Sequence, residues 1–167
     1  MAFREVRTRK DSVLLKKALP VKRFGAWLIR LLDDMEETMS LADGVGLAAP
    51  QVGISKRVIV IMEEERNLRL INPEIISLEG ESVDIEGCLS VPEFLGKVKR
   101  AEKVVVKALN EYGKEITIEA EGRLARALQH EIDHLDGVLF IDKAIEIYSN
   151  NPLPNIEAVE LIEGNLE

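Results

Sequence analysis

The two histidines of the chain stand four residues apart, in His130-Glu131-Ile132-Asp133-His134. On an α-helix, residues i and i+4 lie about 40° apart around the axis, so both imidazole rings can bind one metal ion. Glu131 is rotated by about 100° from His130, which lets its carboxylate reach a water beside the metal without being a ligand. Two unrelated histidines on an exposed helix would give the same spacing. Because both histidines of the chain fall in this one motif, we favour a metal site.

The only cysteine, Cys88, is the remaining soft donor and stands in Glu86-Gly87-Cys88-Leu89-Ser90. Two imidazoles leave a tetrahedral ion short of ligands, and a thiolate would give three protein ligands with one open position, which is typical of catalytic sites. A closed structural site would need a further Cys or His, which the chain lacks, although a carboxylate could fill that position. A lone cysteine is more often a buried apolar residue. The irregular stretch around Cys88 argues against that alternative.

A glycine-rich segment runs from Gly44 to Gly53 and begins with a literal match to the dinucleotide-binding pattern. That pattern needs a strand before it and a helix after it, whereas here a helix precedes it, and Pro50 with Gly53 argues against a following helix. Without Cβ atoms, Gly44 and Gly46 could let an extended ligand approach the backbone, and the Gln51 amide could donate to an oxygen. From residue types alone, a loop whose glycines only form turns is the favoured interpretation.

The elements that must position these residues follow from hydrophobic periodicity. It predicts helices over 22–39 and 121–135, and strands over 56–62, 68–73, 75–78, 82–85, 102–109 and 115–120. Turns are expected at 79–81 and 110–114. On the second helix, Leu124, Leu128 and Leu135 form an apolar ridge away from the histidines, which indicates a central helix. Because the strands cluster between the helices, the order predicts an α+β fold with antiparallel pairing.

Composition sets the class of protein. The chain has 167 residues, 46% hydrophobic and 31% charged, which suits one globular domain and excludes a disordered chain. A net charge of −8 argues against nucleic-acid binding through bulk electrostatics. The single cysteine excludes an internal disulfide, and no targeting segment or membrane-length apolar run is visible. We expect a soluble, cytoplasmic protein with one domain over 1–150 and an acidic tail over 151–167, helical or disordered.

Taken together, residues 44–51, 86–90 and 129–134 resemble the three motifs of the peptide deformylase family, and the similarity runs from Asp11 to Ile145. The resemblance implies antiparallel sheets packed around the helix that carries the histidines. It implies a hydrolase that removes the formyl group from the N-terminal formylmethionine of newly made polypeptides and releases formate. It also implies one divalent metal, commonly Fe²⁺, with Zn²⁺, Ni²⁺ or Co²⁺ as alternatives, held by Cys88, His130 and His134.

The resemblance further assigns Glu131 as general base and acid, with Gln51 and the Leu89 backbone N–H stabilising the oxyanion. We expect the peptide to lie along the backbone of Gly44 and Gly46. Walls for its methionine side chain are expected from Val45, Leu124 and Ala127.

Outside these motifs, Glu86 is expected to orient a ligand imidazole, Asp133 to pair with Arg100, and Arg126 to lie at the pocket rim or the surface. The chain departs from the common family pattern at Ser12, where many members have Pro, and at residues 94–96, where many carry an Arg. The tail is acidic where some members have a basic helix, which argues against ribosome docking through the tail. A transient ribosome contact is still expected. No DNA or membrane partner is expected.

Two other functions fit parts of the pattern. A general metallopeptidase with the same helix motif would usually take a downstream His or Glu as its third ligand, and no downstream His exists. A non-catalytic, metal-stabilised binding module would keep the metal closed to water.

Overall fold

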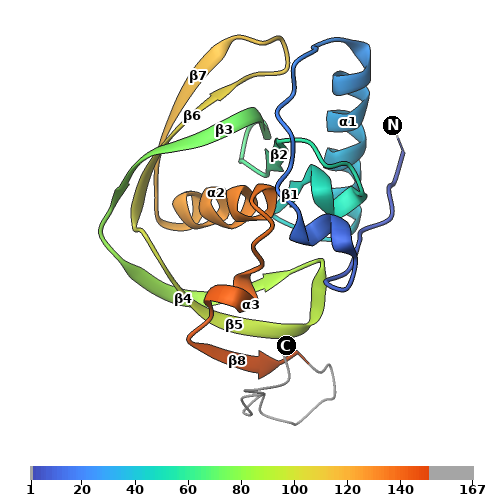
Figure 1. The fold of residues 1–167 in the computed structure, drawn as a ribbon. Coiled ribbons are helices and arrows are strands. Elements are labelled where there is room, and N and C mark those ends of the chain that lie inside the picture. The colour runs from blue at the N-terminus through green and yellow to red at the C-terminus, as the bar shows by residue number, and fades with distance from the viewer. Residues whose placement is uncertain (1, 151–167) are drawn as a thin grey trace.

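The structure, a computed structural model, describes residues 2–150 and holds two antiparallel sheets with a helix between them (Figure 1). The five-stranded sheet has the order β1 (Gly46–Ala48), β2 (Val58–Ile61), β3 (Leu68–Glu79), β6 (Lys103–Leu109), β7 (Glu115–Glu121). The three-stranded sheet has the order β4 (Ser82–Cys88), β5 (Val91–Arg100), β8 (Glu146–Ser149). The helices are α1 (Ala26–Leu41), α2 (Gly122–Leu135) and the short α3 (Phe140–Lys143). The predicted α+β class, with antiparallel sheets around a central helix, is confirmed.

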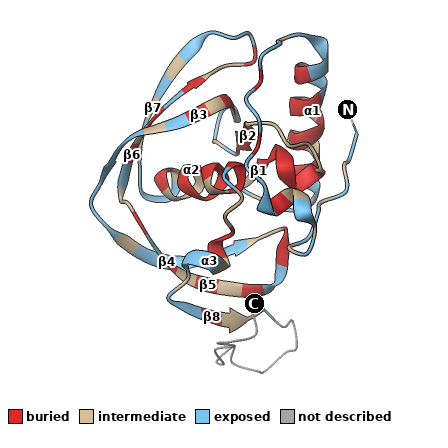
Figure 2. Cartoon of the chain, viewed as in Figure 1, coloured by how far each residue is buried: buried red, intermediate tan, exposed pale blue. Residues whose placement is uncertain are grey.

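Strand β2 is buried on both faces, which explains why it reads as an unbroken apolar run. Successive side chains of a strand point to opposite faces. Val58 and Val60 accordingly pack in the cluster built on α1, whereas Ile59 and Ile61 pack in the cluster built on α2. Figure 2 shows the same arrangement, with buried residues concentrated on α2 and on the inner side of α1. This double packing fixes the distance between the two long helices.

Helix α2 is held in place by its apolar face. Ala125, Leu128, Ile132 and Leu135 are buried against the five-stranded sheet. The histidines lie on a different face of the same helix, so packing of the leucine side turns the polar side toward the three-stranded sheet. The fold thereby positions the motif residues through a helix that has no freedom to rotate.

Strand β3 is a single strand where the sequence predicted two, ended by Asn72-Pro73. The strand continues through this point because the pairing with β6 is irregular between Ile71 and Glu74. Asn72 takes a left-handed conformation, φ 52°, at the bulge. Its side chain accepts from Val21 N at 2.8 Å and donates to Val21 O at 2.9 Å. A bulge is a position where a strand tolerates proline, so the predicted stop was wrong.

Strand β4 does not pair with the strand before it, contrary to what the turn at 79–81 suggested. The chain instead crosses to the second sheet, where Ser82 pairs with Arg100 of β5. β5 itself was not predicted, because Pro92 and Gly96 interrupt its pattern. Phe94 and Gly96 of β5 pair in turn with Ser149 and Ile147 of β8. The three-stranded sheet therefore depends on pairings that local sequence does not indicate.

Three smaller expectations had mixed outcomes. The hairpin over 110–114 is confirmed by the regular β6–β7 ladder. The first helix begins at Ala26, four residues later than predicted. Residues 49–52, inside the glycine-rich segment, form a short 3-10 helix with Pro50 in its first turn. The next element is strand β2, so the expectation that no helix follows the segment is confirmed. The tail over 151–167 lies outside the described residues.

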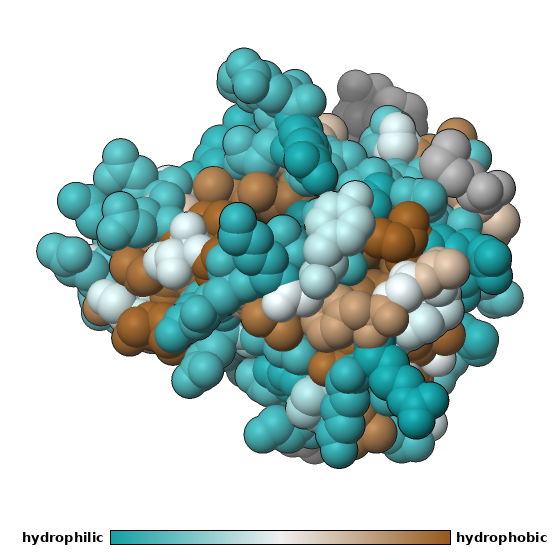
Figure 3. All heavy atoms as spheres, turned by 90° about the horizontal axis from the view of Figure 1, so that it is seen from above, coloured by the Kyte–Doolittle hydropathy of each residue, from teal (hydrophilic) through white to brown (hydrophobic). Residues whose placement is uncertain are grey.

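The surface between these elements is mixed. Seen from above, apolar residues are exposed in patches among hydrophilic side chains (Figure 3). Within residues 2–150, none of the helices is long and apolar enough to cross a lipid bilayer.

Candidate metal centre

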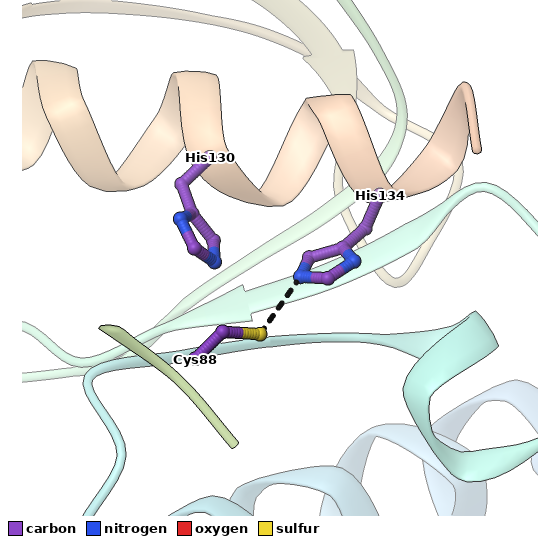
Figure 4. A group of neighbouring side chains, drawn as sticks. All are labelled: Cys88, His130 and His134. Carbon is purple, nitrogen blue, oxygen red and sulfur yellow. Dashed lines mark hydrogen bonds between the residues drawn. The ribbon is translucent and has the colours of Figure 1, made fainter. Parts of the chain in front are cut away.

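The three predicted ligands meet at one point, although they come from separate elements (Figure 4). His130 and His134 are on α2, and Cys88 ends β4. Their donor atoms all lie within 4.8 Å of one another, and Cys88 Sγ is 3.3 Å from His134 Nε2. Metal–ligand bonds of about 2.0–2.3 Å at tetrahedral angles place donor atoms about 3.5 Å apart. The geometry therefore fits a single cation with one sulfur and two nitrogen ligands.

The charge around the three side chains also suits a cation. Burial alone would lower the pKa of His130, but Glu131, the Cys88 sulfur and Glu86 together raise it well above its usual value. Surroundings that favour a positive charge on this ring favour a metal cation at the same place. Burial, with the nearby positive charge of His130 and Arg100, holds the pKa of His134 well below its usual value. A neutral imidazole is the form that binds metals.

Glu86 fixes the orientation of the His130 ring, as the sequence led us to expect. Its Oε1 lies 2.8 Å from His130 Nδ1, which leaves Nε2 to face the other two donors. Arg100 donates to Glu86 through Nη2 at 2.8 Å and also donates to Asp133 at 2.8 Å, which confirms the predicted Arg100–Asp133 pair. Burial would raise the pKa of Glu86, but the hydrogen bonds from His130 and Arg100 hold it well below its usual range.

Arg126 is neither at the surface nor only at the rim, the two places considered for it. Its Nη1 donates to Glu86 Oε2 at 2.6 Å and to Val98 O at 3.0 Å, and its Nη2 donates to Ser82 O at 3.0 Å. It also contributes to the wall of the neighbouring pocket. Arg126 thus ties α2 to both β4 and β5, a role that only the tertiary arrangement reveals.

Glu131 stands beside the three donors and is 4% exposed. Its Oε2 lies 4.0 Å from His130 Nε2, and its Oε1 is buried without a hydrogen-bond partner among residues 2–150. Burial raises the pKa of Glu131 to about 7, against the opposing charge of His130. A carboxyl with such a pKa can accept and return a proton near neutral pH.

The glycine-rich segment approaches this carboxylate closely. A Cβ atom on Gly46 would lie 2.7 Å from Glu131 Oε2, and one on Gly44 would lie 2.9 Å from Leu89 Cδ1. Neither glycine has a positive φ, so the interpretation of turn-forming glycines does not explain these two, although it holds for Gly53, whose φ is 86°. They are small because side chains of the site occupy the space a Cβ would need.

Gln51 is fully buried next to Cys88. Its Oε1 accepts from Ala48 N at 2.9 Å, and its Nε2 donates to Ser90 Oγ at 3.1 Å and to Cys88 Sγ at 3.5 Å. The first of these bonds fixes which way the amide faces. Its N–H groups therefore point toward the sulfur and the space beside it.

A pocket of about 1160 Å³ opens beside Cys88 and His130. Its walls include Gly44, Val45, Gly46, Gln51, Cys88, Leu89, Leu124, Ala127, His130 and Glu131, so every residue predicted for catalysis or peptide binding lines it. Sequence reasoning missed Met62 and the charged rim of Asp43, Glu63, Glu64 and Arg123. The position of Met62 could have been inferred from strand pairing, because an antiparallel β1–β2 pair must bring residue 62 beside Val45. Met62 N indeed donates to Val45 O at 2.9 Å.

Comparison with known proteins agrees with this geometry. The sequence profile described as "Polypeptide deformylase" matches residues 3–150. The chain belongs to the polypeptide deformylase family. A peptide deformylase of Caldicellulosiruptor bescii is 54% identical over 153 residues, 92% of each chain. Peptide deformylase 1 of Clostridium acetobutylicum is 55% identical over 150 residues, 90% of this chain and all of that one.

Solved structures give the same result. The crystal structure of a peptide deformylase from Legionella pneumophila matches with a TM-score of 0.83 at 49% identity, covering 85% of this chain and 86% of that one. The peptide deformylase from Thermotoga maritima matches with a TM-score of 0.84 at 43% identity, covering 86% and 99%. The chain is a deformylase, a metal-dependent hydrolase that removes the N-formyl group from newly made polypeptides.

Proposed function

We propose that this deformylase binds one divalent metal through Cys88, His130 and His134 and that Glu131 moves the proton during hydrolysis of the formyl amide. The observation that carries the proposal is the convergence of the three donor atoms within 4.8 Å, beside a buried carboxylate on the wall of a large pocket. A metal held by Cys88, His130 and His134 would supply Lewis acidity to the hydrolysis. Glu131 accepts a proton from the attacking water and delivers it to the departing amine nitrogen, and formate leaves.

The formyl oxygen gains negative charge as the water attacks. Gln51 Nε2 and the backbone N–H of Leu89, which immediately follows Cys88, are proposed to donate to it. The bond from Ala48 N to Gln51 Oε1 supports this role, because it holds the amide in place before substrate arrives. Each such donor is typically worth about 3 kcal/mol in the transition state.

The peptide is proposed to add to the edge of the five-stranded sheet. β1 is the terminal strand of that sheet, and only β2 pairs with it among the described strands. An extended peptide can use the backbone of Gly44 and Gly46 there, as in other cases of β-strand addition. The methionine side chain would then enter the apolar part of the pocket formed by Val45, Leu124 and Ala127.

We propose Fe²⁺ as the native metal, with Zn²⁺, Ni²⁺ and Co²⁺ as alternatives. One thiolate and two imidazoles suit all four ions, so the donor set supports a divalent transition metal. The availability of each metal then decides which ion is bound. Elemental analysis of protein purified without oxygen, paired with activity, tests this assignment. Zinc as the metal that tracks activity would contradict it.

We further propose a single catalytic domain over 1–150, an acidic tail over 151–167, a cytoplasmic location and a transient contact with the ribosome. The family match over residues 3–150 supports the domain boundary. Limited proteolysis should leave an active fragment that ends near residue 150. Loss of activity on removal of the tail would contradict this boundary.

The central experiment measures formate release from a formyl-Met tripeptide. Turnover should disappear with a chelator and return when Fe²⁺ is added, and the acetyl-Met tripeptide should serve as the unreactive control. Turnover that survives complete metal removal would contradict the proposed mechanism. Release of amino acids from within an unformylated peptide would point to a metallopeptidase instead.

A further inference from the structure

A second cavity, of about 420 Å³, lies where the segment before α1 meets the segment before β2. No residue of this cavity lines the large pocket at the metal centre. It is a separate site, and the deformylation chemistry makes no use of it. Its walls are Leu19, Pro20, Val21, Lys22, Arg23, Trp27 and Lys56.

The walls of the second cavity are fixed by backbone hydrogen bonds. Leu19 N donates to Ser55 O at 3.1 Å, and Arg57 N donates to Leu19 O at 3.0 Å, which joins the two segments. Val21 is held on its other side by the two hydrogen bonds to the Asn72 side chain. The cavity is therefore formed before any ligand arrives, which lowers the cost of binding.

The charge at this cavity is opposite to that of the whole chain. Lys22, Arg23 and Lys56 form no ion pair with any residue from 2 to 150, and none of the seven wall residues is acidic. Lys16 and Lys17, in the same segment, also form none within that range. A chain with a net charge of −8 thus keeps uncompensated positive charges together beside one cavity. Such a local cluster attracts polyanions even when bulk charge does not.

An aromatic ring stands among these cations. Trp27 is 40% exposed, and its Nε1 donates to Arg23 O at 3.2 Å, which holds the indole against the loop. Leu19 beside it is 59% exposed. An exposed, positioned aromatic ring with surrounding Lys and Arg is the combination that binds single-stranded nucleic acids, because bases stack on the ring and phosphates contact the cations.

We propose that this cavity binds single-stranded RNA, with phosphates on Lys22, Arg23 and Lys56 and a base stacked on Trp27. The metal-site pocket is less favourable for the same ligand, because acidic residues outnumber Arg123 and Arg126 in its lining. A concave site with an exposed aromatic ring suits a base and its phosphates, because the ring offers a face on which a base can stack. RNA exposed on ribosomes, where the nascent substrates emerge, is one source of the ligand.

Trp27 is the only tryptophan, so its fluorescence reports on this cavity alone. Titration of the full chain with a short mixed-sequence RNA oligonucleotide at low salt should quench the fluorescence and saturate. Three phosphate contacts predict a slope of about −2 for log K against log salt, since each contributes about −0.7 on a single strand. Inorganic polyphosphate, which has no bases, should bind more weakly and cause little quenching.

Charge-removal variants locate the binding. K22A/R23A/K56A should bind labelled RNA at least about tenfold more weakly, with a salt slope near zero. The matched control, K97A/K99A/K103A, removes three exposed cations that are already paired with Glu146, Glu81 and Glu121, and should bind RNA as the unaltered chain does. W27L, followed by fluorescence anisotropy of labelled RNA, should lose affinity while keeping part of the salt slope.

Several outcomes would overturn the proposal. These are the absence of saturable quenching, equal weakening by both triple variants, and binding to anionic lipid vesicles without binding to RNA. Formate release by K22A/R23A/K56A should equal that of the unaltered chain. That readout separates failure of this proposal from failure of the proposed catalytic mechanism.

Discussion

Gly46 leaves the space that the carboxylate of Glu131 occupies. A Cβ atom at position 46 would lie 2.7 Å from Glu131 Oε2 and 3.0 Å from its Cγ, closer than such atoms can stand. The edge strand β1 and the proposed catalytic carboxylate are therefore in mutual contact. The shape of the active site depends on the absence of one methyl group.

Substitution G46A should lower kcat for deformylation by about 10- to 100-fold, because the carboxylate must move by a fraction of an ångström or more. Bound metal per chain should not change, since Glu131 is not a ligand. G44A is the matched control, because its Cβ meets the flexible end of Leu89 and should cost less. Equal turnover in G46A and the unaltered chain would show that the carboxylate position is not critical.

Substitution E131Q should keep the metal and lose about 10²- to 10⁴-fold in kcat, because the amide cannot accept the proton from water. C88S and H134A should instead lose bound metal. Metal analysis and formate release, measured on the same samples, separate the two classes. A fully active E131Q enzyme with its metal retained would remove Glu131 from the mechanism.

Substitution E86Q should weaken metal binding by about 10- to 100-fold, because Glu86 orients the His130 ring. It should also lower the free energy of unfolding by about 3 kcal/mol, since buried Arg100 and Arg126 lose their shared partner. D133N is the control, because Asp133 contacts Arg100 but neither histidine. Competition with a chelator and denaturant unfolding give the two quantities. A metal affinity equally reduced in D133N would mean that Glu86 acts only through stability.

Asp34 should make stability depend on pH. Burial raises its pKa, but the hydrogen bonds from Ala2 N and Arg4 outweigh burial and leave the pKa below its usual value. A folded pKa below the unfolded value adds stability that is complete above the unfolded pKa and is lost as pH falls through the folded pKa. D34N should therefore lower the free energy of unfolding by about 1.5 kcal/mol at pH 7. The difference in unfolding free energy between D34N and the unaltered chain should shrink as the pH falls below the ordinary aspartate pKa, as urea titrations at pH 7 and at acidic pH would show.

Local sequence predicted the motif helix well, because the residues that define it lie within fifteen positions. The spacing of His130 and His134 and the apolar ridge of α2 are both features of the amino-acid order alone. Glu86 and the Arg100–Asp133 pair were also expected. These predictions needed only helix geometry and a short list of candidates.

The features that local sequence did not predict depend on how the strands pair and pack in the folded chain. β5 carries Pro92 and Gly96, which interrupt its apolar pattern, and although it follows its partner β4 directly, its other partner β8 is remote in the chain. The three contacts of Arg126 need β4 and β5 in place, and the role of Gly46 needs β1 to lie against α2. The continuity of β3 depends on an Asn72 bulge that local rules treat as a stop.

The origin of the three donors has a consequence for folding. Cys88 belongs to the small sheet, whereas both imidazoles belong to the helix packed on the large sheet. A cation held between them would cross-link these two layers near the middle of the protein and would resist their separation. The melting temperature should therefore rise with the concentration of the ion. At one hundred times the dissociation constant of the ion, binding adds about 2.7 kcal/mol to the free energy of unfolding.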